Sequence, residues 1–207
     1  SLWLGGSALG HVFARLPATL MLTVPAVVGG GLLGVLLGSV AARRPDSWLA
    51  SGLNVISYSV ISIAEFWLAI MLVLVFAVNI LWLPTAGYDP KPQVLILPIL
   101  VLALRPFAQN FQLTQATMSA EYGKPYILAA RAKGLSEGQV ARRHVLRNVA
   151  VPVVTLLLFE LSRVFVGTAI IIEIVFAWPG IGRLAASALF RGDIFLVQAI
   201  VMVAATA

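Results

Sequence analysis

Residues 18–42 form a run of 25 residues without a charged side chain, which strongly limits what the chain can fold into. A helix of about 20 apolar residues is long enough to cross the hydrocarbon core of a bilayer. The composition agrees, because 60% of the residues are hydrophobic and only 11% are charged, whereas soluble domains carry about 25% charged residues. The run therefore predicts a membrane-spanning helix.

Other apolar segments predict four more spans, over residues 58–83, 94–118, 151–177 and 194–207. The last holds only 14 residues, and we interpret it as a fifth span that the end of the sequence cuts short. The predicted fold is all-α, a polytopic bundle of transmembrane helices over residues 1–207, with five of six expected spans present. We expect the chain to be cut at both ends.

Small side chains recur at every fourth position of the first predicted span, at Ala26, Gly30, Gly34 and Gly38. Such a stripe lets the backbones of two membrane helices approach closely. We therefore expect this face of the span to pack against protein rather than lipid.

Basic residues are unevenly divided between the two sides of the predicted membrane. One set of alternate loops holds eight of the fourteen Lys and Arg residues, the other set holds four, and Arg105 and Arg163 lie inside spans. Because Lys and Arg collect in cytoplasmic loops, the side with eight is predicted to be cytoplasmic. The net charge of +6 then reflects membrane topology, and we expect no nucleic-acid partner.

The sequence contains no motif that would supply catalytic chemistry. It has no Cys, no G-x-x-x-x-G-K-[ST] phosphate loop and no H-E-x-x-H zinc motif. The two histidines, His11 and His144, fall on opposite sides of the predicted membrane and cannot share a metal ion. We expect no catalytic residue, no metal site and no cofactor bound by this chain.

Polar side chains inside the predicted spans are candidates for lining a path across the membrane. A charge at the centre of a span costs about 2.5–3.5 kcal/mol on insertion scales, so it normally faces protein or water. The candidates are Arg105, Gln109, Gln112, Glu160 and Arg163. The first three follow one helix face, and the last two are three residues apart, where they can pair. All five either line a hydrated path or hold helices together, whereas Glu65 and Glu173 are expected near the membrane surfaces.

A polar, basic segment, residues 119–150, is predicted to be a cytoplasmic loop between the third and fourth spans. Pro125 suits the first position of a helix, and Gly134 suits its end. Ser136 and Gln139 then make a capping box. The loop is therefore predicted to hold a short helix, a glycine break and a longer helix that runs into the fourth span.

The short helix suits a groove on another protein, with Ala129 and Ala130 as a small docking surface. The alternative is a basic segment that contacts anionic lipid beside the membrane. The arginines of the second helix do not gather on one face, which favours the protein partner.

This loop resembles the "EAA" loop of ABC importer permeases. The family pattern is Glu-Ala-Ala, three residues and Gly, and "LAARAKG" (128–134) matches it at both alanines and the glycine, with Leu128 in place of Glu. The stretches "LPATLMLTV", "EFWLAIMLVLVFA", "WLPTAGY" and "IIIEIVFAWPGIGRL" are similar to peptide-type permeases in the same order. The resemblance covers nearly the whole chain and indicates the dipeptide, oligopeptide and nickel branch.

The resemblance implies a multi-pass permease subunit of an ATP-driven importer of short peptides in the bacterial inner membrane. Its implied partners are a homologous second permease, cytoplasmic ATPase subunits that hold ATP and Mg²⁺, an extracytoplasmic substrate-binding protein and membrane lipid. Residues 127–135 would form a coupling helix seated in the ATPase. The residues implied in this coupling are Leu128, Ala129, Ala130, Arg131, Lys133, Gly134, Leu135 and Ser136.

Other functions remain as alternatives. Nickel or another small solute could replace peptides within the same family. A self-sufficient channel or secondary carrier would predict internal repeats with interrupted helices, and the sequence shows no convincing repeat. A structural anchor for a cytoplasmic complex would have no need of charged spans.

Overall fold

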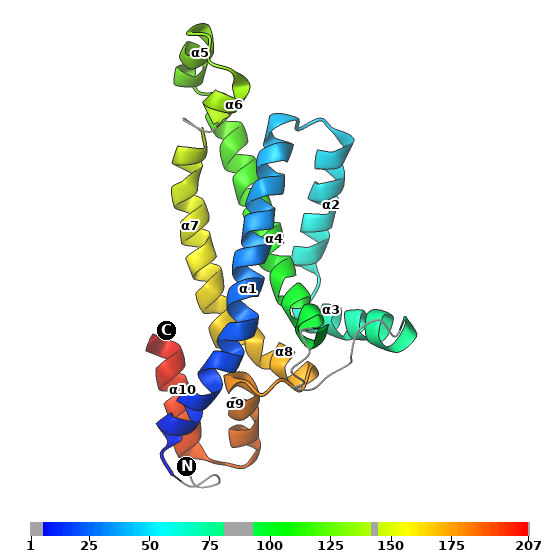
Figure 1. The fold of residues 1–207 in the computed structure, drawn as a ribbon, viewed down its shortest axis with the longest axis vertical. Helices are drawn as coiled ribbons and strands as arrows, with labels where there is room; N and C mark the ends of the chain where they lie inside the picture. Colours follow the sequence, from blue (N-terminus) through cyan, green and yellow to red (C-terminus); the bar gives the residue numbers. More distant parts are fainter. Residues whose placement is uncertain (1–5, 81–92, 142–144, 207) are drawn as a thin grey trace. The chain divides into compact units, whose positions relative to one another are not determined.

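The computed structural model describes residues 6–80, 93–141 and 145–206, and all regular structure in these ranges is helical (Figure 1). The chain divides into two compact units. Unit 1 comprises Ser1–Val27, Ile63–Ala103 and Glu160–Ala207. Unit 2 comprises Val28–Ser62 and Leu104–Phe159.

The described residues of the two units form a series of helices. In chain order they are α1 (Ala8–Arg43), α2 (Trp48–Ser62), α3 (Glu65–Leu72), the π-helical η1 (Val73–Asn79), α4 (Gln93–Tyr122), α5 (Pro125–Ala132), α6 (Glu137–Val140), α7 (Leu146–Arg163), the π-helical η3 (Val164–Thr168), α8 (Ala169–Val175), α9 (Ile181–Phe190) and α10 (Ile194–Thr206). Three of them, α1, α4 and α7, contribute residues to both units.

Two helices, α1 and α4, are each long and apolar enough to cross a membrane. This confirms the first and third predicted spans. The fourth predicted span is helical from α7 through η3 to α8, and α10 covers the fifth segment. The structure therefore confirms the all-α fold expected of a membrane protein.

The second predicted span, residues 58–83, is wrong as a single helix. The helix stops at Ser62, and Ala64 is extended (φ −67°, ψ 131°) before α3 starts. Three serines of α2 donate their hydroxyls to carbonyl oxygens three or four residues earlier, a pattern that weakens and bends helices. The break was not predicted because residues 58–83 are mainly apolar and contain no Pro or Gly. Residues 81–83 lie outside the described residues.

In unit 2, glycines of α1 bring its backbone against α4. A Cβ placed on Gly34 would overlap the Phe107 carbonyl oxygen and lie 2.9 Å from the Phe111 nitrogen. A Cβ on Gly38 would lie 2.7 Å from the Phe111 carbonyl oxygen. The predicted close packing is confirmed at these two positions, because no side chain larger than hydrogen fits between the helices there.

In unit 1, the first part of α1 packs against the C-terminal helices. Val12 of α1 shares a buried apolar cluster with α9 and α10, which contribute Ile181, Leu184, Ala188, Leu196, Ala199 and Ile200. Helix α9 was not predicted, since its 10 residues are too few to register as a span.

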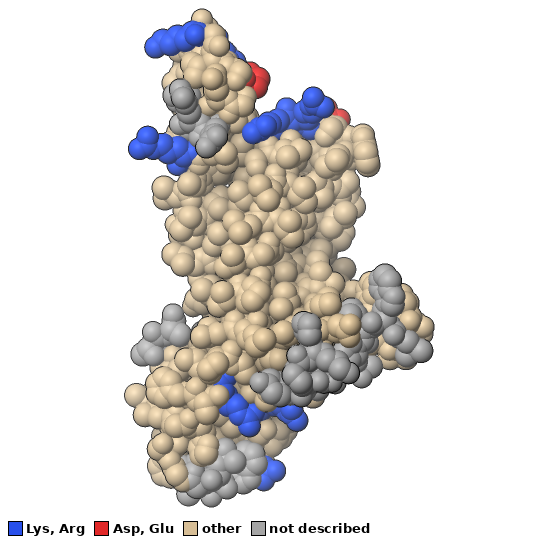
Figure 2. Space-filling view, viewed as in Figure 1, with Lys and Arg blue, Asp and Glu red and all other residues tan. Residues whose placement is uncertain are grey.

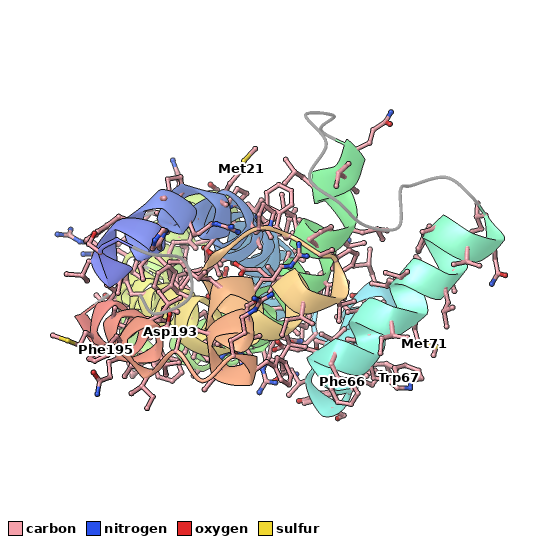
Figure 3. All side chains as sticks on the ribbon, turned by 90° about the horizontal axis from the view of Figure 1, so that it is seen from below. Met21, Phe66, Trp67, Met71, Asp193 and Phe195 are labelled. Atoms are coloured by element: carbon pink, nitrogen blue, oxygen red, sulfur yellow. The ribbon has the colours of Figure 1, made fainter. Side chains whose placement is uncertain are left out.

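The outward side chains of unit 1 are largely apolar. Phe66 and Trp67 of α3 are about half-exposed and point away from the helix on its outer side, and Met21 projects outward from α1 (Figure 3). Phe195 is also exposed. Large exposed apolar surfaces of this kind mark contact with lipid or with another protein.

Candidate functional site

The loop helix α5 begins and ends where the sequence predicts. Pro125 is at its first position, after an extended Lys124 (φ −76°, ψ 146°). Gly134 has φ +82°, a left-handed conformation that favours glycine. The Leu135 N–H donates to the Ala130 carbonyl (3.3 Å), and the Gly134 N–H donates to the Arg131 carbonyl (2.9 Å). These bonds satisfy the end of the helix and turn the chain back.

One face of α5 is buried and the other is open. Ile127 and Ala130 lie in an apolar cluster with Ala42 of α1, Met118 of α4 and Val149 of α7. Leu128 is 60% exposed, and Ala129, Ala132 and Lys133 are also exposed. The prediction of Ala130 as docking surface is wrong, because it is only 7% exposed and packs inside the loop. Helical geometry puts residues 127 and 130 on one face and 128 and 129 on the other.

The capping box that was predicted after the glycine is present. The Ser136 N–H donates to Gln139 Oε1 (3.0 Å) at the start of α6. Helix α6 has only four residues, Glu137–Val140. Its predicted continuation toward the fourth span passes through residues 142–144, which lie outside the described residues.

Arg131 forms a two-pronged ion pair within the loop. Its Nε donates to Glu137 Oε1 (2.7 Å), and its Nη2 donates to Glu137 Oε2 (3.1 Å). These hydrogen bonds raise the pKa of Arg131 above its ordinary value. The pair joins α5 to α6 across the glycine turn, so Arg131 helps to fix the loop itself.

The base of the loop is held by a cluster that the sequence analysis missed. Glu121 accepts hydrogen bonds from Lys124 and from the Tyr126 hydroxyl. Asn148, at the start of α7, donates to the Tyr126 oxygen (3.0 Å) and to Glu121 Oε2 (3.4 Å). The bond to Glu121 raises the pKa of Tyr126. These hydrogen bonds thus connect the two ends of the loop, and no local sequence pattern predicts them.

A groove lies between α2 and α4 of unit 2. It encloses about 420 Å³ and is lined by Asn54, Tyr58, Gln112, Gln115, Ala116 and Ser119. Five of the six side chains are polar and none is charged. Gln112 also donates to Ser57 Oγ (3.2 Å). Of the predicted path residues on α4, Gln112 lines the groove, whereas Arg105 and Gln109 do not and are partly buried.

The predicted pair of Glu160 and Arg163 is confirmed as part of a larger network in unit 1. Arg163 Nη2 lies 2.8 Å from Glu160 Oε2, and Glu160 is fully buried. Arg163 Nη1 also donates to Glu65 Oε1 (3.1 Å) and Thr168 Oγ1 (3.0 Å). Glu65 was expected near a membrane surface, not in this network. Because these partners take four of the five N–H donors of Arg163, the geometry favours a helix-linking role for the pair.

Glu173 of α8, also expected near a membrane surface, is fully buried in unit 1. Its carboxylate accepts hydrogen bonds from Thr19 Oγ1 (2.7 Å) and the Arg183 N–H (3.1 Å). Thr19 Oγ1 in turn accepts a bond from the Ile181 N–H (2.9 Å). A Cβ on Gly180 would overlap the carboxylate. The "AWPGIG" turn is therefore folded around a buried acid.

Comparison with known proteins assigns the family. Residues 34–207 match the sequence profile described as "binding-protein-dependent transport system inner membrane component". The chain belongs to this family. The description of this family names an inner-membrane component, which agrees with the long apolar helices α1 and α4.

Curated relatives of this permease-family chain have names from peptide transport. It is 32% identical to the oligopeptide transport system permease protein AppB of Bacillus subtilis, over 94% of this chain and 64% of AppB. It is 32% identical to the di/tripeptide permease DppB of Pseudomonas aeruginosa (95% and 66%) and 35% identical to the glutathione permease GsiC of Escherichia coli (91% and 61%). The chain thus spans less than two thirds of each relative's length.

A solved structure supports the fold of this permease-family chain. One chain of the MetNI methionine ABC transporter, in an inward-facing conformation, superimposes with a TM-score of 0.70 and 18% sequence identity. The match covers 93% of this chain and 89% of the other. This likeness confirms the predicted ABC permease fold.

Proposed function

We propose that this chain is the transmembrane permease subunit of an ATP-driven ABC importer of short peptides. Family membership and the names of the relatives support this proposal. The single observation that carries it is the arrangement of α5, which packs by one face on the membrane helices and leaves Leu128 and Ala129 exposed on the other. A cytoplasmic ATPase that holds ATP and Mg²⁺ would cover this face.

The anchoring of α5 gives the proposed ATPase a means to move the membrane helices. Ile127 and Ala130 contact a cluster that includes residues of α1, α4 and α7. The ion pair to Glu137 and the Glu121–Tyr126–Asn148 cluster hold both ends of the helix. Because protein cores are close-packed, a displacement of α5 is transmitted to these helices rather than absorbed locally.

The polar groove between α2 and α4 is the proposed passage for the solute in this subunit. Amide and hydroxyl side chains can both donate and accept hydrogen bonds, which suits the N–H and C=O groups of a peptide main chain whatever its side chains. A nickel ion would favour imidazole ligands, and no histidine is among the six residues that line the groove. Peptide is therefore preferred over nickel. A homologous second permease would close the passage, and an extracytoplasmic binding protein would deliver the solute.

Cross-linking tests the proposed coupling directly, because the chain has no Cys of its own. Leu128→Cys should form a cross-link to the ATPase subunit in membranes that contain the whole transporter. Leu158→Cys, an exposed leucine on α7, is the matched control and should form none. If Leu128→Cys reacts only with lipid-phase or aqueous reagents and never with a second subunit, the proposal is wrong.

A further inference from the structure

A second pocket in unit 2 lies beside the loop but does not include the outward face of α5. It encloses about 480 Å³ and is lined by Ala42, Arg43, Arg44, Tyr122, Arg131 and Glu137. Three arginines face one glutamate, so the pocket carries an excess of positive charge. Neither the proposed ATPase contact of α5 nor the polar groove accounts for this positive charge.

The positive charge of this pocket is not neutralised within the described residues. Glu137 takes two of the five N–H donors of Arg131, which leaves the donors of the other terminal nitrogen available. In the described part of the chain, the guanidinium groups of Arg43 and Arg44 have no hydrogen-bond or ion-pair partner. Arginine forks match the spacing of phosphate oxygens and can bind them with two parallel hydrogen bonds.

Tyr122 supplies a neutral donor in the same pocket. Its hydroxyl is buried and has no hydrogen-bond partner among the described residues. Buried polar groups are almost always hydrogen-bonded to protein, water or a ligand. An acceptor oxygen in the pocket would satisfy this hydroxyl and contact the arginines at the same time.

The pocket lies at the ends of two helices that are long and apolar enough to cross a membrane. Helix α1 ends at Arg43, and α4 ends at Tyr122. On the face that Figure 2 shows, the Lys and Arg side chains of unit 2 gather at the end that carries α5, and the surface of α2 and α7 away from this end is uncharged. Lipid phosphates lie at this depth, where basic side chains attract anionic headgroups.

We propose that the pocket of Arg43, Arg44, Tyr122 and Arg131 binds a phosphate group. Its position at the helix ends favours the headgroup of an anionic phospholipid over free phosphate as the source. A bound phosphate would bridge the end of α1 to Arg131 of α5, so it would hold the loop against the membrane helices. Phosphate binding in this pocket does not depend on which solute the transporter carries.

Lipid binding to the full chain tests the proposal. The purified protein in detergent is titrated with a fluorescent phosphatidylglycerol, and unlabelled phosphatidylglycerol, phosphatidylcholine and inorganic phosphate are used as competitors. The double variant Arg43→Gln/Arg44→Gln should bind the probe at least about ten-fold more weakly, since each tenfold corresponds to about 1.4 kcal/mol and one charge-assisted bond supplies that much. Arg147→Gln is the matched control, because Arg147 is exposed at the start of α7 and does not line the pocket.

The competitors distinguish the two sources of phosphate. Displacement by phosphatidylglycerol but not by inorganic phosphate supports the lipid, and displacement by both at similar concentrations supports free phosphate in the same pocket. Equal losses in the double variant and in Arg147→Gln would overturn the proposal. Equal displacement of the probe by phosphatidylcholine would also overturn the proposal. If the double variant binds the probe as the unchanged protein does but no longer co-purifies with the ATPase, the pocket is a protein contact and the proposal is wrong.

Discussion

Gly34 shows how one residue decides the packing of two membrane helices. A Cβ at this position meets the backbone of α4 at Phe107 and Phe111, which cannot turn aside as a side chain could. Gly34→Ala should therefore lower the free energy of unfolding by about 1–3 kcal/mol, as overpacking usually does. Gly29→Ala is the control in the same helix, since nothing lies within 4 Å of its added Cβ. The midpoints of thermal unfolding in detergent compare the two, and equal midpoints would contradict the close approach.

Thr19 donates a hydrogen bond to the carboxylate of the buried Glu173. Its hydroxyl accepts from the Ile181 N–H and donates to Glu173, and all three groups are buried. Thr19→Val keeps the shape but removes both bonds, so it should cost about 1–3 kcal/mol by leaving buried polar groups unsatisfied. Thr19→Ser restores the hydroxyl and should recover most of the loss. Thermal unfolding of both variants checks this, and a loss of similar size in Thr19→Ser would point to packing instead.

The partners of such residues can be predicted from the sequence only when they lie close together on one helix. Glu160 and Arg163 could be paired from their spacing, because both lie on one helix face. Thr19 and Glu173 are 154 positions apart, and Glu65 and Arg163 are 98 apart. Local periodicity carries no information about such partners, so both acids were placed at the membrane surface.

At the scale of elements, α5 carries the proposed docking contact on its exposed face. Ala129→Trp would add a bulky side chain there without disturbing the buried residues Ile127 and Ala130. Peptide uptake by the assembled transporter should fall on the order of ten-fold or more, since a loss of only about 1.4 kcal/mol of docking energy is a factor of ten. The ATPase rate should also lose its response to the loaded binding protein. Uptake and ATPase assays in proteoliposomes measure both effects.

Ala150→Trp is the matched control for this element, because Ala150 is an exposed alanine on α7, outside α5. It should leave uptake within about two-fold, a difference of well under 1 kcal/mol. If Ala129→Trp transports as well as Ala150→Trp, α5 is not the coupling element.

Short elements were predictable where the residue chemistry is local. Pro125, Gly134 and the Ser136–Gln139 box each satisfy backbone groups within a few residues, so the sequence located α5 and the start of α6. The side of α5 that is buried was not predicted, because it depends on Met118 and Val149 from distant helices. The break between α2 and α3 was missed because no Pro or Gly marks it, and its serines and Glu65 were included in one mainly apolar stretch.

At the scale of the whole molecule, the distribution of basic residues predicts the orientation in the membrane. Single cysteines in this Cys-free chain can report it. Ser136→Cys lies in the loop of α5 and α6, and Arg191→Cys lies after α9, and both positions are exposed. Because Lys and Arg favour the cytoplasmic side, an impermeant thiol reagent should label Arg191→Cys in intact cells and Ser136→Cys only after the membrane is opened.

This labelling result decides more than topology, since the proposed ATPase can reach α5 only from the cytoplasm. If Ser136→Cys is labelled from outside, a cytoplasmic ATPase cannot be the partner of α5, even if the helix is folded as described. Both sites reacting from the same side would imply an even number of crossings between them. The α7–η3–α8 helix and the α9 turn would then need to return the chain to its starting side. The functional role would then have to be sought at the buried Glu173 and its turn, and not at the loop of α5 and α6.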